Sequence, residues 1–166
     1  TVDIIDLSYE GLGVAKVDGY PLFIENALPG EQVEILVVKT GNKFGYAKVM
    51  NWLKESSDRQ PLEDNRLLRT GIAPLAHLKY EQQLQFKQKQ IQNVMTKIAK
   101  MPEVEILPTI GMENPVAYRN KAQIPVRRID GRLATGFYKK NSHELIEIDD
   151  FYIQDPAIDQ AIIAVR

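Results

Sequence analysis

The chain has 166 residues, of which 44% are hydrophobic and 26% are charged, and its formal net charge at pH 7 is −1. This is the composition of an ordinary globular protein, and without an apolar run of about 18 residues or a basic-then-apolar leader we expect a cytoplasmic location and no membrane partner. The absence of cysteine excludes disulfides, thiolate nucleophiles and iron–sulfur ligation, and two distant histidines, His77 and His143, give no reason to expect a metal site.

The first 55 residues are predicted to form four or five short strands. Runs of β-forming residues are separated by glycine-containing turns, among them Asp18-Gly19, which is typical of a two-residue β-hairpin. Curling such strands into a small closed barrel would remove the exposed edges. We therefore expect a small OB-fold-like β-barrel at residues 1–55.

The remainder of the chain is predicted to be a connecting loop followed by an α+β domain. Residues 56–74 lose periodicity, and from Leu78 to Met101 apolar residues recur with helical spacing. Strands are expected at 104–110, 117–127, 132–139 and 144–149, with a hairpin at Asp130-Gly131 and a last helix from Pro156. The fold class is thus mixed β and α+β, with a central domain at 75–166 holding a long helix and a mostly antiparallel sheet.

Positive charge is concentrated in two segments of this nearly neutral protein. Residues 39–54 contain four lysines and no acidic residue, and residues 116–140 contain seven basic residues against one acidic residue. Strand alternation would place Arg119, Lys121 and Gln123 on one face of the expected strand. The pattern suits phosphate contacts, although a solvated strand face would look the same. The candidate RNA-binding residues are Lys39, Lys43, Lys48, Arg119, Asn120, Lys121, Gln123, Arg127, Arg128 and Lys139.

Aromatic residues accompany both basic segments. Tyr118 and Tyr138 lie in the second, and Phe44, Tyr46 and Trp52 in the first. Aromatic side chains beside lysines can stack on bases. They can also fill the barrel, and for Trp52 this second interpretation is at least as good. No pair of carboxylates and no glycine-rich phosphate loop indicates catalysis or a cofactor site.

Several stretches together resemble the bacterial RNA uracil-5-methyltransferases. Residues 7–33, LSYEGLGVAKVDGYPLFIENALPGEQV, resemble a TRAM domain, and AHLKYEQQLQFKQ, NPVAYRNKAQIPV and GFYKKNSHELIEIDDFYIQDP resemble the central domain of that family. The resemblance implies RNA as the partner, most often 23S rRNA and not DNA. It further implies S-adenosylmethionine as the cofactor, bound by a catalytic domain that follows the central domain and supplies a cysteine nucleophile. This chain ends before such a domain, so the resemblance makes it an RNA-recognition fragment that is inactive alone.

The chain departs from the family at the iron–sulfur cluster that many members hold. Alignment on the flanking residues places the four cluster cysteines at Asp64, Thr70, Ala73 and Phe151. The resemblance therefore assigns the chain to a cluster-free branch, in which no iron–sulfur cluster is expected and contacts of Leu75 and Phe151 join the loop to the sheet. Two alternatives stay open: a stand-alone RNA-binding or ribosome-associated adaptor, and a tRNA uridine-5-methyltransferase of the same family.

Overall fold

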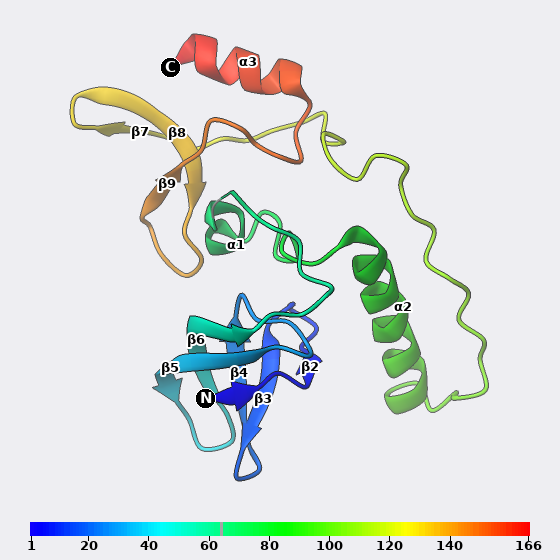
Figure 1. Ribbon diagram of the computed structural model, residues 1–166. Helices are drawn as coiled ribbons and strands as arrows, with labels where there is room; N and C mark the ends of the chain where they lie inside the picture. Colours follow the sequence, from blue (N-terminus) through cyan, green and yellow to red (C-terminus); the bar gives the residue numbers. More distant parts are fainter. Residues whose placement is uncertain (64) are drawn as a thin grey trace. The chain divides into compact units, whose positions relative to one another are not determined.

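The computed structural model describes residues 1–63 and 65–166 and divides into two compact units. One unit comprises Thr1–Leu62 with Pro74–Thr109, and the other comprises Glu63–Ala73 with Ile110–Arg166. None of the described helices is long and apolar enough to cross a membrane. The elements in Figure 1 are β1 (Val2–Asp3), β2 (Asp6–Leu7), β3 (Gly13–Val17), β4 (Tyr20–Glu25), β5 (Gln32–Thr40), β6 (Gly45–Lys54), α1 (Arg66–Thr70), α2 (Tyr80–Lys97), β7 (Val126–Ile129), β8 (Arg132–Tyr138), β9 (Leu145–Glu147) and α3 (Pro156–Val165).

The first unit contains a mixed six-stranded sheet with the order β1-β5-β6-β4-β3-β2. Only the β4–β6 pair is parallel. The hairpin expected at Asp18-Gly19 is confirmed, and both turn residues have the positive φ values, 49° and 81°, that such a turn requires.

A closed barrel is not found, which corrects the expectation for residues 1–55. Among the described strands no ladder joins β1 to β2, which occupy the two edges of the sheet. The reason is local, because the two strands are only two residues long and the chain between them changes partner: the Ile4 N–H donates to Glu31 O and the Ile5 N–H to Val14 O. One short segment thus covers both edges, which leaves little edge exposed for pairing with another chain.

Strand alternation separates a buried face of this sheet from a solvent-facing one. The core of the unit consists of residues that are at most 4% exposed, among them Ala15, Leu22, Ile24, Val33 and Ala47. The residues between them on β3, β4 and β6 point the other way.

Helix α2 is confirmed close to its predicted bounds, but it belongs to the first compact unit. Its Lys89 Nζ lies 2.8 Å from Asp6 Oδ1, and the Gln90 side chain donates to the carbonyl of Tyr9. The compact units therefore do not follow the boundaries predicted at residues 55 and 74. The sequence pattern locates the helix, whereas these side-chain contacts decide which unit it joins.

The second unit packs α1 and α3 with the antiparallel sheet β7-β8-β9. Its core is Ile146, Ile148 and Phe151, with Ile72 and Phe137 packed against it. The hairpin at Asp130-Gly131 and the final helix are confirmed, the helix with Asp155 as its N-cap.

The strand predicted at 104–110 is wrong, and of the strand predicted at 117–127 only the last two residues lie in a strand, β7. Residues 98–125, all of them described, hold no strand beyond the bridge of Arg119 to Gln154 (Figure 1). Pro108, Pro115 and Pro125 lack the N–H that a ladder needs, so β-forming residues alone do not make a sheet there.

Candidate nucleic-acid interface

The three lysines predicted in the first unit lie along β5, β6 and the turn between them. Lys39 and Lys48 are on strands and Lys43 is in the turn, and all three side chains are exposed. Strand register places Lys39 opposite Tyr46, and Lys48 opposite Glu25 and Leu36. None of the three forms an ion pair with a described residue. Their charges are therefore available to a ligand.

Three aromatic side chains gather beside these lysines on the solvent-facing side of the sheet. The ring centroids of Phe23 and Phe44 are 5.5 Å apart, those of Phe44 and Tyr46 5.7 Å, and those of Phe23 and Tyr46 5.9 Å. We call these three residues the aromatic cluster. The side chains of Phe44 and Tyr46 therefore do not fill the interior of the first unit, and this interpretation is wrong for these two residues. Phe23, from a strand 20 residues earlier, was not identified from the sequence, because only the parallel β4–β6 pairing brings it to Tyr46.

Trp52, by contrast, has a structural role. It packs against the core of the sheet, and its Nε1 donates to the Glu31 carboxylate at 3.2 Å. The guanidinium of Arg59 lies over its ring, 5.1 Å from the centroid. The interpretation that Trp52 contributes to the interior is the one that the structure supports.

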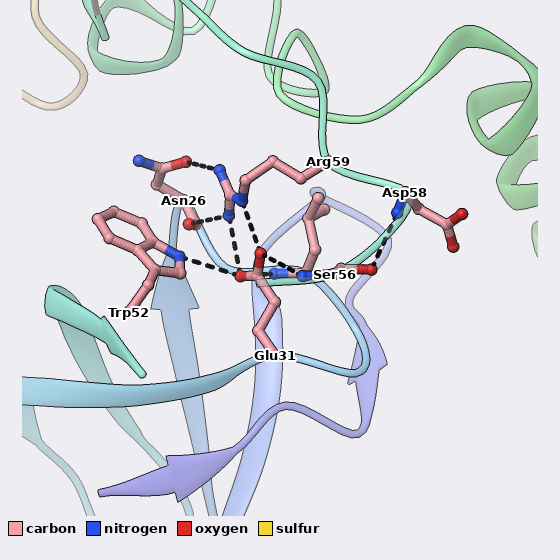
Figure 2. A network of polar contacts seen from close by, with 7 residues as sticks. Asn26, Glu31, Trp52, Ser56, Asp58 and Arg59 are labelled. Atoms are coloured by element: carbon pink, nitrogen blue, oxygen red, sulfur yellow. Dashed lines mark hydrogen bonds and ion pairs between the residues drawn. The ribbon is translucent and has the colours of Figure 1, made fainter. Parts of the chain in front are cut away.

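Glu31 is the centre of a buried polar network that joins the sheet to the segment after it (Figure 2). Its side chain is fully buried and accepts hydrogen bonds from the backbone N–H groups of Leu28 and Ser56, from Trp52, and from Nε and Nη2 of Arg59 at 2.6 and 2.9 Å. Arg59 also donates to the side chain and the backbone carbonyl of Asn26.

Burial by itself would raise the pKa of Glu31. The hydrogen bonds from Arg59 and from the Leu28 backbone outweigh this effect and lower the pKa. The carboxylate is thus held ionised and saturated with donors, which describes a structural joint, and it offers no free base for catalysis.

In the second unit, four predicted residues lie in the extended segment before β7. Arg119, Asn120, Lys121 and Gln123 are all exposed. The Arg119 backbone N–H donates to Ile153 O and its carbonyl accepts from Asp155 N, which fixes this one point of the segment. The structure therefore does not present them as one face of a strand, because the strand that would alternate them is missing.

The three remaining predicted residues lie on or next to the β7–β8 hairpin. The Arg127 guanidinium donates to the Tyr138 hydroxyl at 3.1 Å and lies 5.7 Å from its ring centroid. Arg128 donates to Gly131 O, and Lys139 lies 3.4 Å from Glu144. Arg127 and Tyr138 thus form a cation–aromatic pair on the surface. The positive charge of Lys139 is partly compensated by the carboxylate of Glu144.

The positions that align with the cluster cysteines carry no metal-binding constellation among the described residues. Asp64 lies outside the described residues. The Thr70 hydroxyl donates to Arg66 O inside α1, Ala73 is half-buried, and Phe151 is 1% exposed in the core, with its ring centroid 5.4 Å from that of Phe137.

The predicted packing of the loop on the sheet is found for Phe151. Ile72, from the loop, packs against the core that contains Phe151. Leu75 belongs to the other unit and lies beside Gly11, where a Cβ would be 2.8 Å from Leu75 Cδ2. Gly11 also has a φ of +80°, so the turn favours glycine at this position.

The chain is similar to several known proteins. Residues 1–50 match the TRAM domain family. The chain is 62% identical over 165 residues to a protein named Uncharacterized RNA methyltransferase from Enterococcus faecalis, and 55% identical over 165 residues to one of the same name from Lactiplantibacillus plantarum. Both alignments cover 99% of this chain but 36% of the relative, so the chain spans about a third of the length of these relatives.

A solved structure shares the fold over almost the whole chain. It is the Pyrococcus abyssi tRNA (uracil-54, C5)-methyltransferase in complex with S-adenosyl-L-homocysteine, with a TM-score of 0.64 and 20% identity over 99% of this chain and 35% of that one. The first 50 residues are similar to TRAM domains. Over 99% of its length, the chain is similar to about a third of proteins that are named RNA methyltransferases.

Proposed function

We propose that this chain is the RNA-recognition part of an S-adenosylmethionine-dependent RNA uracil-5-methyltransferase that acts on 23S rRNA. The observation that carries the proposal is the TRAM domain together with 62% identity, over 99% of the chain, to a relative named as an RNA methyltransferase. The uracil-5 specificity is supported by the fold shared with a uracil-C5 methyltransferase and by the sequence resemblance described above.

The residues of this chain do not fit S-adenosylmethionine. Methyl-donor and nucleotide cofactors are usually held by a glycine-rich turn between a parallel strand and a helix. In the described part of the chain the single parallel pair of strands, β4 and β6, belongs to the TRAM sheet, and no helix follows either strand directly. We therefore assign cofactor binding and methyl transfer to the remainder of the protein, and expect this chain alone to be inactive.

The chain's own contribution is to bind RNA and orient it. Lys39, Lys43 and Lys48 on the TRAM domain and Arg127 on the hairpin are exposed cations suited to phosphate contacts. A uracil must leave its stack before its carbon 5 can be modified, so an enzyme of this class needs to hold the flanking RNA while the base is extruded. We place that holding function in this chain.

A second candidate substrate is tRNA, which is the substrate in the name of the Pyrococcus abyssi enzyme. A stand-alone RNA-binding adaptor is the alternative from another class. It would have the same binding properties as the enzyme fragment. The gene sequence after the codon for Arg166 distinguishes the two alternatives. The enzyme requires a following methyl-donor domain with a cysteine nucleophile, whereas the adaptor requires a stop codon.

The binding half of the proposal is tested by titrating the purified chain with a fluorescent fragment of unmodified 23S rRNA at several salt concentrations. We expect saturable binding that weakens as salt rises, with Lys39→Ala lowering affinity and reducing the slope of log K against log salt by about 0.7 to 0.9. Lys87→Ala, which removes an exposed lysine of α2, is the matched control and should change neither quantity. Absence of saturable binding at low salt would overturn the proposal.

A further inference from the structure

The aromatic cluster lies on the solvent-facing side of the TRAM sheet, next to the turn that joins β5 and β6. Cα register aligns Val14, Phe23, Tyr46 and Lys39 in a row across β3, β4, β6 and β5. The neighbouring row of Gly13, Ile24 and Ala47 faces the core, and Ile24 and Ala47 are buried to at least 99%. The pleat therefore fixes Phe23 and Tyr46 on the outside, so their position is a property of the fold. Phe44 lies in the turn before β6, and its ring packs against both of theirs.

The rings of the cluster remain substantially open to solvent. Phe44 is 41% exposed and Tyr46 37% exposed, although each packs edge-to-face against a neighbouring ring. Leaving large aromatic groups in water forgoes stabilisation that burial would give. The mutual packing holds the rings in place without covering them, which is the property of a preformed binding platform.

The charge around the cluster identifies the ligand. Lys39 is the cross-strand neighbour of Tyr46, and Lys43 precedes Phe44 in the turn. No acidic residue occurs between positions 39 and 54, and the carboxylate that register places closest on this side is Glu25, opposite Lys48. Exposed rings flanked by cations with no ion-pair partner suit a ligand that has both aromatic faces and negative charge, which is a nucleic acid strand.

Building on the proposed RNA-binding function, we propose that the aromatic cluster stacks on unpaired bases while Lys39 and Lys43 contact the adjacent phosphates. Base faces are accessible only where the RNA is not paired, since in a duplex they are covered by neighbouring pairs. The TRAM domain of this chain thus recognises a single-stranded segment of its RNA and discriminates against duplex.

The test separates stacking from phosphate contact by comparing two strands that differ only in their bases. The probes are a fluorescent single-stranded RNA of about 10 nucleotides, within the range of sites on OB-type folds, and the same strand with abasic nucleotides at its centre. The 166-residue chain should bind the complete strand about tenfold more tightly, the equivalent of one base–aromatic stack. Tyr46→Ala should abolish this preference, and Tyr46→Phe should retain it.

Two further variants keep the test decisive. Tyr46→Leu preserves apolar volume while removing the ring, so it loses the preference without loss of the fold, which the fluorescence of Trp52 reports. Tyr152→Ala removes a tyrosine of matching exposure, 38%, from the other unit and should leave the preference unchanged.

The inference is overturned if the wild-type chain binds both strands equally, or if Tyr46→Ala and Tyr46→Leu keep the preference. It is likewise overturned if these variants abolish self-association of the chain in sedimentation and leave RNA binding untouched, since the cluster would then be a protein interface. Equal, salt-dependent binding to both strands leaves the proposed function intact. Failure to bind either strand rejects the proposed function itself.

Discussion

Replacing Glu31 with glutamine should strongly destabilise the first compact unit. The substitution preserves the shape of the side chain but removes its charge and replaces one acceptor oxygen with an NH2 donor. The carboxylate receives five hydrogen bonds, two of them from the Arg59 guanidinium, and its side chain has no exposed surface. At least one buried donor would face another donor, and Arg59 would lose its counterion.

The expected loss follows from the burial of the two partners. Removing one member of a buried ion pair costs about 3–5 kcal/mol, because the other charge is left uncompensated. The Arg59 side chain is 13% exposed and keeps its hydrogen bonds to Asn26, so water and the Asn26 oxygens can partly compensate its positive charge. We therefore expect a loss near the lower limit, about 3 kcal/mol in the free energy of unfolding.

The measurement is urea-induced unfolding followed by tryptophan fluorescence. Trp52 is the only tryptophan in the sequence, and it belongs to the network, so it reports on this unit directly. Glu34→Gln is the matched control: Glu34 is exposed on β5 and accepts one hydrogen bond from Asn51, so its replacement should cost less than about 0.5 kcal/mol. If Glu31→Gln lies within 1 kcal/mol of the wild type (roughly the noise of such comparisons), the structural reasoning about this network is wrong.

Three other changes have expected outcomes. Because the pKa of Glu31 is lowered in the folded chain, its contribution to stability is complete above its ordinary pKa of 4.5 and is lost as pH falls through the lowered value; urea midpoints of wild type and Glu31→Gln should therefore converge in acid, and a constant difference would contradict the assignment. Phe151→Ala should cost about 3–5 kcal/mol in the second unit, seen as faster amide exchange in β8 and β9; unchanged exchange rates there would refute the packing. Arg127→Ala should weaken RNA binding more than Arg132→Ala, since Arg132 is already paired with Glu147 at 2.6 Å; the reverse order in a binding titration would show that the hairpin contacts RNA differently.

Local sequence signals predicted the elements that depend on local physics. The two Asp-Gly hairpins, the amphipathic helix α2 and the Pro156 helix start are found close to where turn chemistry and periodicity place them. The strand expected at 104–110 and most of the strand expected at 117–127 are not found, because β-forming residues need a hydrogen-bonded neighbour and prolines in both stretches remove donors. β-propensity is a preference of a single residue, whereas a strand forms only when a second segment is available to pair with it.

The site was predictable only in part, for the same reason. Clustered charge in the sequence predicted Lys39, Lys43 and Lys48 as RNA contacts, and the structure places them exposed on one strand pair and its turn, which leaves their role a prediction. The aromatic cluster required the parallel β4–β6 pairing to bring Phe23 to Tyr46, and the Glu31–Arg59 network joins residues 28 positions apart. Neither has a spacing that a sequence pattern reveals.

The central claim is that the protein carrying this chain methylates carbon 5 of uridine in 23S rRNA. The most direct measurement is mass-spectrometric mapping of 5-methyluridine in 23S rRNA and in tRNA from a strain that lacks the gene, with a complemented strain as control. We expect at least one 5-methyluridine to disappear from the 23S rRNA of the deletion strain and to return on complementation. The 5-methyluridine content of tRNA should be the same in all strains. Retention of every 5-methyluridine in both RNAs would contradict the account, and its loss from tRNA alone would move the substrate to the second candidate.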